Sequence, residues 1–83
     1  MEQFYNNTMA LPLEQRNNKL AQIVAFLRQN QAHPEADAFL ELKNCYPMNS
    51  FIREDTSFRA YQAWGRIYDL SGHRLIRHIV SQG

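Results

Sequence analysis

The segment from Thr56 to Leu70 constrains the fold most, because its helical pattern is apolar over an unusually wide arc. One sector of its helical projection holds Phe58, Tyr61, Trp64, Gly65 and Tyr68. The adjoining sector holds Ala60, Ala63, Ile67 and Leu70, and together the two sectors span about 220°. A helix with so wide an apolar arc either lies in the middle of its fold or meets a second chain. We therefore expect a central helix at about 56–70.

Three further helices are expected from start signals and apolar spacing. Pro12 suits a first helical position, and Glu14 follows where the helix dipole favours an anion, which predicts a helix at about 12–30. Pro34 gives a second start of the same kind, for a short helix at about 34–45 followed by a turn at 46–49. Ser71 is expected to cap the last helix, which ends near Gln82. The predicted fold class is all-α, a compact bundle of about four short helices with the helix at 56–70 central.

A chain of 83 residues forms one domain, and we assign it to 12–83, preceded by an N-terminal arm at 1–11. Phe4, Tyr5 and Met9 can dock this arm on the body or on a partner. The predicted core consists of Leu20, Val24, Leu27, Phe39, Ile67 and Ile79. A domain of this size buries only roughly 60–65% of its unfolded surface, so a deep catalytic cleft would compete with its core.

Catalysis and metal binding find no support in the residue pattern. The chain has no glycine-rich phosphate loop, and its acidic residues at helix starts are explained by capping and the helix dipole. Cys45 and three histidines are the soft ligands available, without a CxxC or HxxxH spacing. His73 and His78 point roughly 140° apart on a helix of 3.6 residues per turn. We expect no enzyme, no catalytic residue, no metal and no cofactor.

Charge, cysteine content and the length of apolar runs indicate the cellular compartment of the protein. The net charge is +1, but residues 34–55 carry −3 and residues 56–83 carry +3. A lone cysteine forms no intramolecular disulfide, which suits a reducing compartment. The first residues lack the pattern of a signal peptide, and the longest apolar run is five residues, Ile23 to Leu27. We expect a cytoplasmic protein that does not cross a membrane.

Two surfaces are candidates for binding. The aromatic sector at 58–68 is flanked by Arg59 and Arg66, and tryptophan, tyrosine and arginine dominate protein-binding hot spots. Gly65 costs about 1 kcal/mol in a helix interior, which suggests that a ring or backbone approaches it closely. The last helix has a basic face. The predicted partner-binding residues are Arg59, Tyr61, Trp64, Arg66, Tyr68, His73, Arg74, Arg77 and His78.

The two surfaces leave two functions open. The first is a small non-catalytic regulator, adaptor or inhibitor that binds another protein, of the kind that phages and mobile elements use against host machines; a homodimer fits the same pattern. The alternative is a DNA-binding regulator with a degenerate helix-turn-helix at about 58–82, whose second helix would enter the major groove. Against DNA binding, His78 falls where that motif usually buries an aliphatic residue, and the total charge is low.

Overall fold

The computed structural model describes residues 1–45 and 53–82, and side chains over 1–45 and 58–82. In this part of the chain there are five helices and no strand: α1 (Glu2–Met9), α2 (Leu13–Gln29), α3 (His33–Asn44), α4 (Arg53–Asp69) and α5 (Arg74–Ser81). The all-α bundle is confirmed, but with five helices where the sequence predicted about four. The predicted turn at 46–49 lies outside the described residues.

The additional helix is α1, in the segment that the sequence analysis treated as an arm. Phe4 is 1% exposed, and its ring meets the rings of Phe39 on α3 and Trp64 on α4 edge-on, with centroids 6.5 and 6.1 Å apart. Thr8 is fully buried, and its hydroxyl oxygen accepts a hydrogen bond of 2.9 Å from Nζ of Lys19 on α2. These contacts hold α1 against three other helices.

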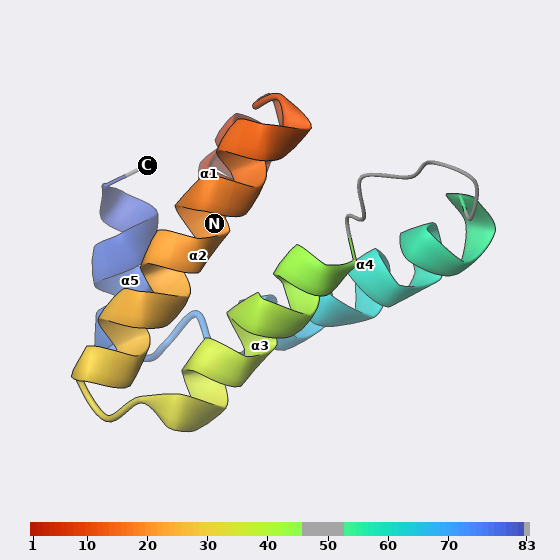
Figure 1. Cartoon of the computed structure of the whole chain (residues 1–83). Helices are drawn as coiled ribbons and strands as arrows, with labels where there is room; N and C mark the ends of the chain where they lie inside the picture. The colour runs from red at the N-terminus through yellow and green to blue at the C-terminus, as the bar shows by residue number, and fades with distance from the viewer. Residues whose placement is uncertain (46–52, 83) are drawn as a thin grey trace.

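Figure 1 shows which of the remaining helices lie next to one another. A short turn joins α2 to α3, α4 lies along α3, and α5 lies alongside α2. His78 of α5 stacks on Phe26 of α2, with ring centroids 5.8 Å apart. Arg66 of α4 forms an ion pair with Glu41 of α3. The helices thus form a bundle in which α5 packs on α2 and α4 packs on α3.

The core forms where these helices meet. Five of the six residues predicted to be buried together are buried: Leu20, Leu27, Phe39, Ile67 and Ile79. The sixth, Val24, is partly buried and packs against this cluster. The inward face of α4 contributes Ala60, Ala63 and Trp64 beside Ile67. The helical spacing of apolar residues therefore identified the buried side of α2 and α4.

The turn between α2 and α3 is a Schellman motif. The Ala32 N–H donates to the Leu27 carbonyl at 2.9 Å, and the Gln31 N–H donates to the Arg28 carbonyl at 3.1 Å. Gln31 has a φ of 63°, the left-handed conformation that this motif requires at the residue after the cap. Glycine is the usual residue there, because a Cβ raises the energy of that conformation.

We expect Gln31→Gly to stabilise the protein, because it removes this conformational cost at an exposed position. The gain should be below about 1 kcal/mol, since glycine also increases the entropy of the unfolded chain. Urea unfolding followed by circular dichroism measures it as a higher midpoint. The matched control is Asn30→Gly, at the preceding residue with a φ of −97°, which should be neutral or destabilising. A lower midpoint for Gln31→Gly would contradict the assigned motif.

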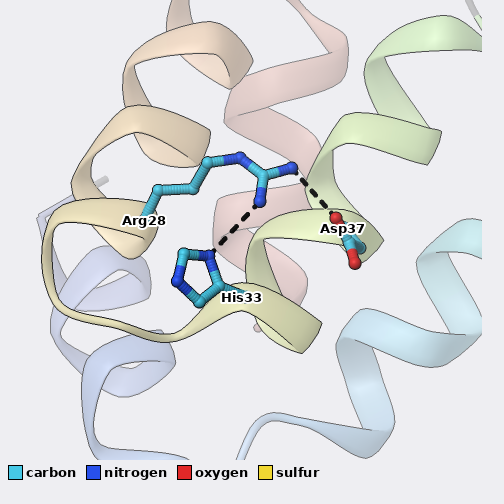
Figure 2. A network of polar contacts seen from close by, with 3 residues as sticks. All are labelled: Arg28, His33 and Asp37. Carbon is cyan, nitrogen blue, oxygen red and sulfur yellow. Dashed lines mark hydrogen bonds and ion pairs between the residues drawn. The ribbon is translucent and has the colours of Figure 1, made fainter.

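A small polar network spans the same turn (Figure 2). Nη2 of Arg28, in the last turn of α2, donates to Oδ1 of Asp37 on α3 at 2.9 Å, and Nη1 lies 3.4 Å from Nδ1 of His33. The Arg28 and Asp37 side chains are 40% and 65% exposed, so solvent screens the pair. An ion pair of this kind contributes less than about 1 kcal/mol and orients the turn more than it stabilises it.

Candidate protein-binding surface

Three large aromatic side chains remain exposed on one face of α4. Phe58, Tyr61 and Tyr68 are 62%, 78% and 43% exposed. With Gly65 they occupy positions separated by three, four and three residues, which place side chains on one face of a helix. We call Phe58, Tyr61, Gly65 and Tyr68 the aromatic stripe. Single exposed apolar residues are ordinary, whereas three exposed aromatic rings on one helix face form a candidate interaction surface.

Trp64 was predicted to belong to this surface, but the structure places it in the core. It is 5% exposed, and its ring lies 4.8 Å from that of Tyr5 and 6.1 Å from that of Phe4, centroid to centroid. Both of these residues belong to α1. The N-terminal helix thus covers the tryptophan and leaves the aromatic stripe uncovered.

The structure also corrects the expectation for Gly65. A Cβ built at this position would meet nothing within 4 Å, so no ring or backbone of the described chain approaches it. The helix therefore carries a residue of low helix propensity without a packing reason among the described residues. Gly65 forms a shallow gap in the aromatic stripe between Tyr61 and Tyr68.

Arg59 and Arg66 lie on the side of α4 that faces α3, and both are exposed. Arg66 pairs with Glu41, whereas Arg59 lines an open pocket of about 250 Å³ beside Asp37 and the buried Cys45. Burial raises the pKa of the Cys45 thiol, although the positive charge of Arg59 opposes the shift. A buried, protonated thiol is a poor nucleophile, so this cysteine acts as a small core residue.

The basic face of α5 is narrower than the sequence suggested, because both of its histidines contact the rest of the fold. Nδ1 of His73 accepts a hydrogen bond of 3.2 Å from the Leu75 N–H, which makes His73 the N-cap of α5 where Ser71 was expected. Nε2 of His73 lies 3.4 Å from Glu35 Oε1. His78 stacks on Phe26.

Arg74 and Arg77 complete this face. Both are exposed, and they lie three residues apart on the outer side of α5. Neither forms an ion pair with another side chain in the described part of the chain. We call Arg74 and Arg77 the cationic pair. Both arginines are directed to solvent, whereas His78 is exposed but stacks on Phe26.

An open pocket of about 360 Å³ lies between α2 and α5, with Ile23, Phe26 and Ile79 among its lining residues. Lys19 lies at its edge, where Nζ donates to Thr8 and sits 4.7 Å from the centre of the Phe4 ring. Burial lowers the pKa of Lys19. Its contacts hold α1 on α2, so the polar groups here serve packing. No group of three metal-ligating side chains occurs among the described residues.

The fold and this surface define a small helical bundle with one exposed aromatic stripe and one cationic pair. No protein-family model matches the chain, and neither the curated proteins nor the solved structures contain a match to it. Among the described helices, none is long and apolar enough to span a membrane.

Proposed function

We propose that this chain is a non-catalytic regulator, adaptor or inhibitor that acts by binding protein through the aromatic stripe. The observation that carries the proposal is the exposure of Phe58, Tyr61 and Tyr68 along one face of α4. Tyrosine and phenylalanine bury a large area at a low cost in side-chain entropy, which is why binding hot spots concentrate them. We place the protein in the cytoplasm, in keeping with its single, unpaired cysteine.

The cationic pair supports a second role in the same activity. Exposed arginines at the rim of an interface raise the association rate with an acidic surface more than they raise the affinity. A target that presents carboxylates would therefore be attracted to Arg74 and Arg77. Regulators of this size, including those of phages and mobile elements, act by such contacts and need no catalytic site.

The decisive experiment is capture of the tagged protein's targets from native lysate, with and without nuclease, by the wild type and by Tyr61→Asp. We expect a nuclease-resistant, stoichiometric protein that the variant captures at least about tenfold less, because Tyr61 is the most exposed ring of the stripe. Ala25→Asp is the matched control, since it adds the same charge at an exposed position of α2. Equal capture by both variants would remove the stripe from the function.

DNA binding is the second candidate, because two exposed arginines on the last helix suit contact with phosphates. It predicts that affinity for duplex DNA falls steeply between about 50 and about 200 mM salt. It further predicts that Arg74→Ala and Arg77→Ala each lower the logarithmic salt slope by about one. We expect weak binding and no effect of either variant, since only these two cations of the basic face lie away from intramolecular partners.

A further inference from the structure

We infer that the aromatic stripe pairs with the same stripe of a second copy, so that two α4 helices cross antiparallel and form a homodimer. This inference rests on the proposed function, because it accepts the stripe as a protein-binding surface and names a second copy as the protein it binds. The dimer then meets an external target through its cationic pairs, and Tyr61→Asp lowers target capture by separating the two copies. The observation that supports it is that Gly65, which has no side chain, lies on the same helix face as three exposed aromatic rings.

The spacing of the stripe repeats a heptad pattern. Residues 58 and 65 lie seven apart, as do 61 and 68, so the four positions form an a/d seam of nearly three helical turns. At 1.5 Å per residue, the seam from Phe58 to Tyr68 is about 15 Å long. A straight seam of this length fits a second helix that crosses at a shallow angle.

An antiparallel register makes the seam complementary to itself. If the crossing lies at position 63, Tyr61 of each copy is opposite Gly65 of the other, and Phe58 is opposite Tyr68. Each Tyr61 ring then fills the gap that Gly65 leaves, and the outer aromatic rings pair at both ends. A parallel register would instead set Gly65 against Gly65 and Tyr61 against Tyr61, which leaves a void beside a crowded contact.

The exposed area indicates a weak dimer. A fully exposed aromatic side chain offers about 200 Å², so the observed exposures leave about 370 Å² on each copy. Two copies would bury about 740 Å² through these rings, roughly half of a standard interface, before the adjoining Gln62 and Asp69 are included. We therefore expect a weak, concentration-dependent dimer with a dissociation constant of roughly tens to hundreds of micromolar.

Figure 1 shows that the beginning of α4 extends beyond the end of α3. The rings of the stripe are exposed along one face of α4, so a second α4 can approach them from the side. In the resulting dimer, each copy keeps its own cationic pair on α5, a separate helix from the one that forms the seam. Dimerisation would then present the cationic pair twice to an acidic target, which strengthens binding if one target reaches both.

Gly65→Ala separates this inference from simple folding effects. Because the added methyl meets no atom of the described chain within 4 Å, the isolated monomer should become more stable, by about 4 to 8 °C in thermal midpoint. In the dimer the methyl occupies the site of the opposing Tyr61 ring, so we expect the dissociation constant to rise about tenfold. Gly72→Ala is the matched control, since its Cβ also meets nothing within 4 Å but lies off the seam.

Sedimentation equilibrium over low to high micromolar concentration gives the dissociation constants. Thermal melting at a protein concentration well below the wild-type dissociation constant gives the stability of the monomer. The inference is supported if the wild type dimerises, Gly65→Ala weakens the dimer while raising the melting temperature, and Tyr61→Asp abolishes it. It is overturned if the wild type stays monomeric, or if Gly65→Ala and Gly72→Ala dimerise alike. A monomeric wild type whose target capture still depends on Tyr61 would overturn the dimer and leave the proposed function standing.

Discussion

Phe4→Ala is expected to lower the free energy of unfolding by about 3–5 kcal/mol, the range for removing a buried aromatic ring. Phe4 is 1% exposed and connects α1 to Phe39 on α3 and Trp64 on α4. A domain of 83 residues has a total stability of only about 4–12 kcal/mol, so the variant should lose a large part of it. Thermal and urea unfolding, followed by far-ultraviolet circular dichroism, measure the change.

Gln3→Ala is the control for this experiment, because it lies next to Phe4 on α1 with an exposed side chain. We expect its stability to stay within about 0.5 kcal/mol of the wild type. The fluorescence of Trp64, the single tryptophan, reports on the same site, since its ring is covered by α1. If Phe4→Ala melts within about two degrees of the wild type and Trp64 emission is unchanged, α1 does not pack as described.

The sequence did not reveal α1, and the reason is physical. Helix α1 has eight residues with Asn6, Asn7 and Thr8 in succession, too short and too polar to be a stable helix in isolation. It forms because Phe4 and Thr8, four residues apart and therefore on one face, are both buried against other helices. Tertiary contacts of this kind leave no periodic signal in so short a segment.

The buried side of α4 could be predicted, but its boundary could not. On the helical projection Trp64 and Tyr61 lie only about 60° apart, so the pattern placed both rings in one sector. The boundary between core and surface runs between them, because α1 covers Trp64 and leaves Tyr61 exposed. Without α1, the helical pattern alone does not decide whether Trp64 belongs to the core or to the binding surface.

The contacts of the basic face of α5 could also be predicted only in part. Helical spacing placed Arg74 and Arg77 outward, and both are exposed. The same spacing gave no indication that His73 would cap α5 and lie beside Glu35, or that His78 would stack on Phe26. These contacts depend on the orientation of each ring and on how α2 and α3 lie against α5. Of the nine residues predicted on α4 and α5, Trp64 is buried and both histidines contact other helices, so the exposed surface centres on the stripe and the cationic pair.

Ile67→Ala should destabilise the protein by about 2–5 kcal/mol, because it opens a cavity at a fully buried position of α4. Leu27→Ala should do the same from the opposing side of the core, where Leu27 is fully buried on α2. Alanine is the stronger helix former in both cases, so local helix propensity would change stability in the other direction. A loss of stability therefore measures the packing of α2 and α4 in the shared core.

A graded series makes this test sharper. Ile67→Val removes one methylene and should cost about 0.5–1.5 kcal/mol, well below the cost of Ile67→Ala. Gln62→Ala, at an exposed position of the same helix, should be neutral or slightly stabilising by helix propensity. The order Gln62→Ala, Ile67→Val, Ile67→Ala in unfolding midpoints then follows the volume removed from the core. If the three variants have the same unfolding midpoint, Ile67 is not buried. The assignment of Tyr61 to the exposed side of α4 then loses its basis as well.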